Sequence, residues 1–379
     1  MPEPYVILFA LLVVWVTIYI VSLLLPLEKY GLVVTPLYLM YKTERFNSFF
    51  NRIAQKNEKL WKILANVGIA AAVVEIFLAI YILATNLQRF IYLPQEAGPV
   101  VPILPGVTIS FTWFPYILVA AGLAITTHEM AHGVVLSAEK IPLKSSGILL
   151  APVTFGGFVE PDEEALDKSP LLSKLRVLAA GSFTNMVTGL LALLLIISLF
   201  ASSTGVLVMD VPENGPVYGA GMRPWEVIYS INGHRLPSVA EFSQFMVAIG
   251  PGVPLTIETS SGLRNIVTAA ADYNETKGII GIRNFLSYRP MRIGEISPQI
   301  TYHLAMTLEW TSLLMINVAI FNMLPLFPFD GEAFVYSLLK KKLKKELKAA
   351  RIAVNAFSLL LLLSNIGFTL VMFGLNPFQ

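Results

Sequence analysis

Two histidines and a glutamate form the residue pattern in this sequence that is best suited to chemistry. They occur in the run His128-Glu129-Met130-Ala131-His132. On a helix, residues four apart lie on one face, so both imidazoles can reach a single ion. Zn²⁺ favours nitrogen ligands, and the glutamate between them is suited to be the general base for a water molecule whose pKa the ion lowers. The pattern therefore predicts a hydrolytic zinc site.

The surroundings of this run strengthen the prediction. The run lies near the end of an apolar segment, Phe111–Ala138, that is long enough to cross a bilayer. Each ionisable residue near the bilayer interior costs at least about 2.5 kcal/mol, and a bound metal ion would compensate for three of them within five residues. The alternative is a helix end at the membrane surface, with the histidines in water or hydrogen-bonded to neighbouring helices.

A third ligand is needed, because catalytic zinc usually has three protein ligands and one position for water. The best candidate is Asp330, which follows Pro325 and Pro328 and precedes Gly331. The prolines break regular helix, and irregular backbone at membrane depth is tolerated only beside protein or a water-filled cavity. The alternative is that Asp330 caps a following helix, Glu332–Lys340. Spacing alone leaves both interpretations open.

The composition indicates what kind of protein must position these residues. Of the 379 residues, 55% are hydrophobic and 14% are charged, against roughly 25% charged in soluble proteins. This balance excludes an ordinary soluble enzyme and a disordered chain. The absence of cysteine excludes disulfides, thiolate metal sites and thiol nucleophiles. The net charge of +2 is too small to indicate a nucleic-acid partner, so none is expected.

The sequence predicts a multi-pass α-helical membrane protein with about six transmembrane helices. A helix needs about 20 apolar residues to cross the bilayer. We expect the first segment to be a retained anchor, because its flank lacks basic residues and its apolar run is too long for a signal peptide. The six segments are Tyr5–Leu27, Ile63–Leu87, Phe111–Ala138, Val177–Ser203, Trp310–Phe329 and Ile352–Gln379.

Lysine and arginine in the loops predict the orientation. The segment between the first two spans has seven basic residues and three acidic ones, and Lys340–Arg351 has seven and one. Both should be cytoplasmic. The N-terminus and the segment after the fourth span should then be extracytoplasmic, and the histidine pair should lie towards the cytoplasmic side. We expect the membrane to be the cell membrane.

Residues 204–290 differ from the rest and predict a small β-rich domain. The runs Val206–Val211, Val227–Ile231 and Leu255–Thr259 are bounded by turn residues, and Val239–Ile249 reads as an amphipathic helix. The predicted organisation is two N-terminal helices in 1–110, a catalytic half in 111–203, the β domain in 204–290 and a second transmembrane half in 291–379.

The run His128–His132 and the later run Asn322–Gly331 together resemble the two motifs of the site-2 protease family of intramembrane zinc metalloproteases. The resemblance spans about residues 110–335 and includes a departure at Ser182, where relatives often have proline. It implies that His128, His132 and Asp330 bind one Zn²⁺ per chain and that Glu129 is the base. The matching residues are His128, Glu129, His132, Asn322, Pro325, Pro328, Asp330 and Gly331.

The resemblance also implies that Asn185 and Asn322 lie near the site. Either amide could donate to the oxyanion that develops on a peptide bond under attack, or it could bond between helices. The run Phe155-Gly156-Gly157-Phe158-Val159 also belongs to the resemblance. As an extended edge, it could hold an unwound substrate by strand addition, with its glycines allowing close approach; the alternative is a loop turn.

The β domain resembles a PDZ domain. Gly205–Val208 corresponds to the peptide-binding loop of such domains, and Trp225-Glu226 replaces their usual Gly-Asp. PDZ domains bind extended C-termini by adding a strand. The domain could therefore capture or select substrates, or act only as a spacer.

The function expected from these features is a zinc endopeptidase in the lipid bilayer. Its substrates would be transmembrane segments of single-pass proteins, as in regulated intramembrane proteolysis. The alternative is a catalytically silent membrane adaptor that presents the PDZ-like domain. A metal transporter would need ligands along a continuous polar path, and the sequence has one cluster.

Overall fold

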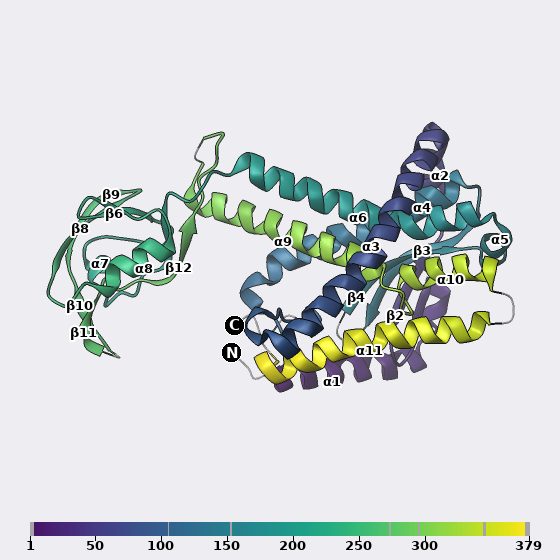
Figure 1. The fold of residues 1–379 in the computed structure, drawn as a ribbon, viewed down its shortest axis with the longest axis horizontal. Helices are drawn as coiled ribbons and strands as arrows, with labels where there is room; N and C mark the ends of the chain where they lie inside the picture. The colour runs from purple at the N-terminus through teal and green to yellow at the C-terminus, as the bar shows by residue number, and fades with distance from the viewer. Residues whose placement is uncertain are drawn as a thin grey trace. The chain divides into compact units, whose positions relative to one another are not determined.

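The chain forms two compact units, which are described separately (Figure 1). The computed structural model describes residues 4–104, 106–151, 154–272, 274–294, 296–343 and 346–375. The helical unit consists of residues up to Leu191 and from Trp310 onwards, and the β unit consists of Ala192–Glu309. Two long helices, α6 and α9, contribute residues to both units.

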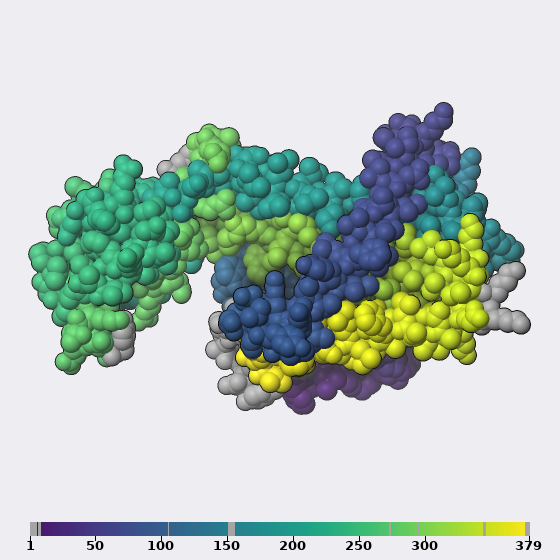
Figure 2. Space-filling model, viewed as in Figure 1, coloured from purple at the N-terminus to yellow at the C-terminus, as the bar shows by residue number. Residues whose placement is uncertain are grey.

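The described part of the helical unit is built mainly from helices. Helix α4 carries the histidine pair, and α10 begins at Asp330. Figure 2 shows α3 and α11 against each other on the surface of this unit. The helices that contribute to it are α1 (Pro4–Leu24), α2 (Asn47–Lys56), α3 (Glu58–Tyr92), α4 (Phe114–Ala138), α5 (Glu163–Lys168), α6 (Leu171–Leu199), α9 (Pro298–Asn322), α10 (Asp330–Lys342) and α11 (Leu347–Phe373).

Five of the described helices are long and apolar enough to span a membrane. They are α3, α4 with the short 3-10 turn Phe111–Trp113 before it, α6, α9 and α11. Helix α1 has a shorter apolar stretch, Phe9–Leu24, so a sixth span remains a prediction. The end of the last predicted span, residues 376–379, lies outside the described residues.

The fifth span was predicted at the wrong position. It was expected at Trp310–Phe329, whereas α9 runs from Pro298 to Asn322. Proline does not support a helix interior, so the segment containing Pro325 and Pro328 is a series of turns between α9 and α10. At the other end, Glu309 does not interrupt the helix.

A four-stranded antiparallel sheet lies in the helical unit, where the sequence predicted only one possible extended edge. Its strands are β1 (Leu32–Val34), β2 (Leu39–Thr43), β3 (Leu143–Ala151) and β4 (Thr154–Pro161), in that spatial order. Among the described strands, β4 pairs only with β3, so it is an edge strand, and it contacts α4 (Figure 1). The sheet therefore places a free strand edge beside the helix with the histidines.

The β unit contains a larger antiparallel sheet, with the spatial order β12-β5-β6-β8-β9. Strand β8 alternates exposed and buried residues, as expected for a strand with one face on a core. Helix α8 (Val239–Val247) packs against this core through Phe242. The strands of the unit are β5 (Gly205–Asp210), β6 (Val227–Ile231), β7 (His234–Arg235), β8 (Pro254–Thr259), β9 (Gly262–Val267), β10 (Ala269–Ala271), β11 (Asn274–Ile279) and β12 (Arg283–Tyr288).

The assignment of Gly205–Val208 as a peptide-binding loop is wrong. These residues belong to β5, which pairs with β12 on one side and β6 on the other. Val206, Leu207 and Val208 are fully buried. A strand with both edges paired cannot accept a peptide, whereas β12 is an edge strand of the same sheet.

Candidate metal centre

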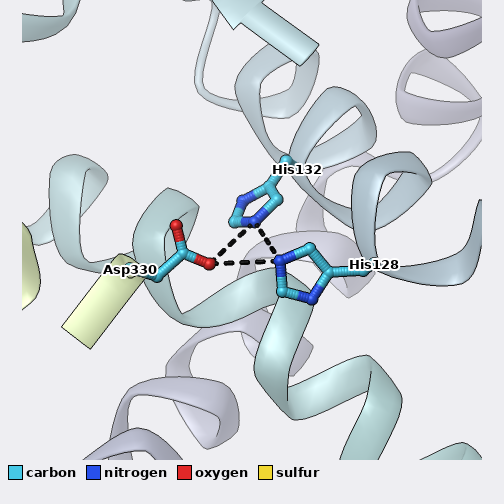
Figure 3. Close-up of side chains that lie close together, drawn as sticks. All are labelled: His128, His132 and Asp330. Carbon is cyan, nitrogen blue, oxygen red and sulfur yellow. Dashed lines mark hydrogen bonds and ion pairs between the residues drawn. The ribbon is translucent and has the colours of Figure 1, made fainter. Parts of the chain in front are cut away.

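Three side chains from two distant parts of the sequence converge in the helical unit (Figure 3). Helix α4 presents His128 and His132 one turn apart, and Asp330 comes from the first residue of α10. The Nε2 atoms of both histidines lie 3.2 Å from Asp330 Oδ2 and 3.1 Å from each other. Asp330 therefore lies with the histidines rather than capping α10, for which Phe329 occupies the N-cap position.

The spacing of these three atoms fits a zinc ion. Zinc lies about 2.0–2.1 Å from nitrogen and oxygen ligands in a tetrahedral site, which places the ligand atoms roughly 3.3 Å from one another. The separations of 3.1–3.2 Å are close to that value. Two imidazoles and one carboxylate also leave the fourth position that a catalytic water needs.

The second nitrogen of each imidazole has a partner that sets its tautomer. His132 Nδ1 lies 2.8 Å from the Val177 carbonyl oxygen, which accepts its proton and leaves the Nε2 lone pair for a metal. His128 Nδ1 faces the Asn185 amide at 3.4 Å. Rotating the Asn185 amide by half a turn exchanges its oxygen and nitrogen. In that orientation the amide oxygen accepts from His128 Nδ1–H. The NH₂ group then donates to Thr127 Oγ1, which lies 3.0 Å from the amide. Thr127 and the Val177 carbonyl were missed by the sequence reasoning.

Helix α6 approaches the metal centre at a glycine. A Cβ on Gly181 would lie 2.5 Å from Nε2 of both His128 and His132. Any side chain here would therefore displace the ligands. The neighbouring Ser182 is fully buried, and α6 remains helical through it, so the absence of proline does not alter the helix at the site.

Asn322 is the last residue of α9 and reaches the same centre. Its Nδ2 donates to Asp330 Oδ2 at 2.8 Å and lies 3.2 Å from His128 Nε2. A donor to a metal-binding carboxylate restricts the orientation of that carboxylate. Both sequence-predicted asparagines therefore touch ligands, Asn185 on a histidine and Asn322 on the aspartate.

Glu129 is a residue of α4, and its side chain faces strand β4. The backbone N–H of Val159 faces the Glu129 carboxylate. A Cβ on Gly157 would lie 2.8 Å from Glu129 Cγ, so only glycine allows this approach. The Phe158 ring packs under the Lys42 ammonium group. A Cβ on Gly156 would meet no described atom within 4 Å. For Phe155, only the backbone is described. The segment from 155 to 159 is thus an extended edge strand at Glu129 and not a loop turn.

The comparisons with known proteins agree with these motifs. The model of Peptidase family M50 matches residues 116–364. An uncharacterized protein of Methanocaldococcus jannaschii is 28% identical over 340 residues, which cover 86% of this chain and 83% of that protein. A putative zinc metalloprotease of Clostridium perfringens is 23% identical over 322 residues, covering 65% of this chain and 94% of that one.

Two further similarities are more partial. A membrane-bound transcription factor site-2 protease homolog of Arabidopsis thaliana is 22% identical over 213 residues, 54% of this chain and 41% of that protein. Among solved structures, the PDZ domain of an SdrC-like protein of Listeria monocytogenes matches 23% of this chain and 90% of that domain, with 24% identity and a TM-score of 0.21. With five membrane-length helices among its described residues and a family model that covers more than half of the chain, this integral membrane protein belongs to peptidase family M50.

Proposed function

We propose that the protein is an intramembrane zinc metalloprotease that cleaves transmembrane segments of single-pass membrane proteins. The observation that carries the proposal is the convergence of His128, His132 and Asp330, with Glu129 beside them and a free strand edge at Glu129. A site for binding metal alone would need the three ligands but neither the glutamate nor the strand.

The chain's own residues supply most of the proposed mechanism. His128, His132 and Asp330 would hold one Zn²⁺, which when bound polarises a water molecule and the carbonyl of the peptide bond. Glu129 accepts the proton of the attacking water and passes it to the leaving amine. Asn185 orients His128 through Nδ1, and Asn322 orients Asp330 through Oδ2. These contacts favour a ligand-orienting role for both amides over direct donation to the substrate.

Strand β4 is proposed to hold the substrate. In an antiparallel pair, alternate residues direct their backbone groups to opposite edges. Since the Val159 N–H points to Glu129, the backbone groups of Gly157 and Phe155 share this free edge. An unwound transmembrane segment could pair with this edge by strand addition and place a peptide bond next to the base.

The β unit is proposed to bind extended peptide ends. A cavity of about 550 Å³ lies in this unit, where the edge strand β12 and helix α8 both contribute to the lining. Apolar side chains there include Phe242, Met246, Ile280, Ile282 and Phe285. A free edge beside an apolar cavity suits capture of a strand-like peptide, such as the trimmed end of a substrate.

The proposed setting is the cell membrane, with the β unit outside the cytoplasm and the metal centre towards its inner face. The basic loops support this orientation. Partners would be the lipid bilayer and single-pass substrates, as in regulated intramembrane proteolysis, and no nucleic acid.

Replacement of Glu129 by glutamine tests the proposal. The purified protein and its Glu129→Gln variant are reconstituted with a single-pass reporter, and zinc content and reporter cleavage are measured. We expect about one zinc per chain in both proteins and cleavage only by the unmodified one. Glu164→Gln, at a largely exposed carboxylate of α5, is the control and should cleave normally. Undiminished cleavage by Glu129→Gln would contradict the assigned role.

The cavity in the β unit also supports a second candidate, an adaptor that only presents this unit to partners. The two candidates differ in metal content. An adaptor needs no zinc at His128, His132 and Asp330, so a protein that retains none after gentle purification, and gains none on addition of zinc, would favour it.

A further inference from the structure

We propose that Arg351 and Asn355, on the last helix α11, are positioning residues that set the place of Asp330 in the metal centre. The inference rests on the proposed function, because it assigns α11 a role in holding a zinc ligand. Asp330 follows a run of turns after α9, whose backbone has short-range hydrogen bonds, such as Phe329 N–H to the Leu326 carbonyl, but no regular helix. Contacts with neighbouring elements therefore contribute to its position.

The first contact is an ion pair two residues beyond the ligand. Glu332 is buried, at 5% exposure, and accepts two hydrogen bonds from the Arg351 guanidinium. Arg351 Nε lies 2.5 Å from Oε1 and Nη2 lies 3.0 Å from Oε2. This two-pronged geometry fixes direction as well as distance, which a single charge contact does not. It joins the first turn of α10 to α11.

The second contact lies on the other side of the ligand. The backbone N–H of Phe327, three residues before Asp330, donates to Asn355 Oδ1 at 2.8 Å. Nδ2 of the same asparagine lies 3.4 Å from Glu332 Oε1 and donates to the Arg351 carbonyl at 2.9 Å. One amide group, one turn along α11 from Arg351, thus contacts both ends of the segment that carries Asp330.

The segment also packs against the turn that directly follows α9. Gly331 lies so close to the Met323 backbone that a Cβ there would collide with the Met323 carbonyl. On the α11 side, the Arg351 guanidinium lies over the Tyr336 ring, with Cζ 4.4 Å from its centre. The segment therefore contacts both this turn and α11.

These contacts have consequences for metal binding. Zinc sites require their ligands within about 0.2 Å of ideal distances, and loss of an outer partner of a ligand typically lowers metal affinity 10- to 100-fold. Without Arg351, the Glu332 carboxylate would be buried and unpaired, and buried charges move towards water or a new partner. Such a movement would shift Asp330, two residues away, relative to the fixed histidines of α4.

An ion pair in the β unit separates positioning from general stability. Arg264 Nη2 lies 3.5 Å from Glu226 Oε1, and the Glu226 side chain is 9% exposed against 6% for Glu332. This pair joins β9 to the residue before β6, and the β unit contains none of the residues of the metal centre. Its loss should lower stability without moving Asp330.

The experiment compares Arg351→Ala, Arg351→Lys, Asn355→Ala and Arg264→Ala in the full-length purified chain. Zinc affinity is measured by competition with a chelator, and thermal stability is measured on the same samples. We expect Arg351→Ala to weaken zinc binding by about 10-fold or more and Arg351→Lys to restore part of it. Asn355→Ala should also weaken zinc binding. Arg264→Ala should leave zinc affinity unchanged, whether or not it lowers the melting temperature. If Arg351→Ala does not fold, Arg351→Lys and Asn355→Ala carry the comparison.

The outcomes distinguish this inference from the proposed function. If the unmodified chain binds no zinc, the proposed function fails. If it binds zinc and cleaves the reporter, but the Arg351 and Asn355 variants bind zinc as tightly as Arg264→Ala, only the positioning role is overturned.

Discussion

The two units of this protein bury different kinds of residue. The largest apolar core of the β unit includes Val206, Ile228 and Ile257, none of which has exposed surface. In the helical unit, several of the most deeply buried side chains are polar: Ser182, Asn185, Ser358 and Asn365 are all fully buried. Many of its apolar side chains point outwards, as on α11.

This difference follows from the surroundings of each unit. In water, burial of apolar surface drives folding, so the β unit collects its apolar residues inside. Between membrane helices that drive is absent, and association relies on close packing and hydrogen bonds between helices. A buried polar residue is therefore ordinary in the helical unit, and only the convergence of particular side chains distinguishes the metal centre from structural contacts.

Removal of a metal ligand should give the largest effect and should separate the two units. We expect Asp330→Ala to lose zinc and to lower cleavage by at least about 100-fold, more than the loss of an outer partner typically does. The β unit should stay folded, because its core contains no residue of the metal centre. Zinc analysis, reporter cleavage and limited proteolysis of the β unit measure the three responses. Simultaneous unfolding of the β unit would contradict the separation.

A methyl group on the edge strand should reduce activity but not metal binding. Gly157→Ala would place a Cβ against Glu129, and misplacement of a catalytic group by about 1 Å can cost about 100-fold in rate. We expect a 10- to 100-fold loss of cleavage with unchanged zinc content. Gly156→Ala is the matched control, because a Cβ there meets nothing within 4 Å. Equal activity of the two variants would argue that the close approach of strand β4 does not set the position of Glu129.

A substitution that leaves an empty space in the core of the β unit tests whether the metal centre is independent of this unit. Ile257 is fully buried, so Ile257→Ala should destabilise this unit by about 2–5 kcal/mol. Hydrogen exchange of the strands should show the loss, while zinc affinity should not change. A fall in zinc affinity would mean that the metal centre depends on the β unit.

The smallest expected effect concerns a carboxylate at the end of the sheet in the helical unit. Ser145 Oγ donates to Glu160 at 2.6 Å and Lys42 Nζ at 2.9 Å, and these bonds hold the pKa of the Glu160 carboxyl below its usual range. A lowered pKa in the folded state means that the ionised group stabilises the fold at neutral pH, and that this stabilisation is lost as the pH falls through the folded-state pKa.

About a third of the Glu160 side chain is exposed, so solvent should limit the contribution to less than about 1 kcal/mol. We expect Glu160→Gln to lower the melting temperature slightly at neutral pH, with the difference shrinking below about pH 4. Thermal unfolding of both proteins across this range is the measurement. A difference that grows with acidity would contradict the assigned sign.

Features of the fold that depend on neighbouring residues could be predicted. The spacing of His128 and His132 placed both rings on one helix face, because helix geometry is set by residues within one turn. The β-rich runs also appeared close to their predicted limits, as in β6. The fifth span was predicted at the wrong position because hydropathy alone does not indicate that the helix ends before Pro325.

Contacts between distant residues were decided only by the tertiary structure. Asp330 follows His132 by 198 residues, and its spacing was equally compatible with a helix cap. The approach of Gly157 to Glu129 and the Arg351–Glu332 pair left no periodic signal in the sequence. The sequence by itself determined which residues could bind a metal and which helices carry them. Which of them meet was settled by the packing of the helices and the strand edge, because local propensities contain no information about partners hundreds of residues away.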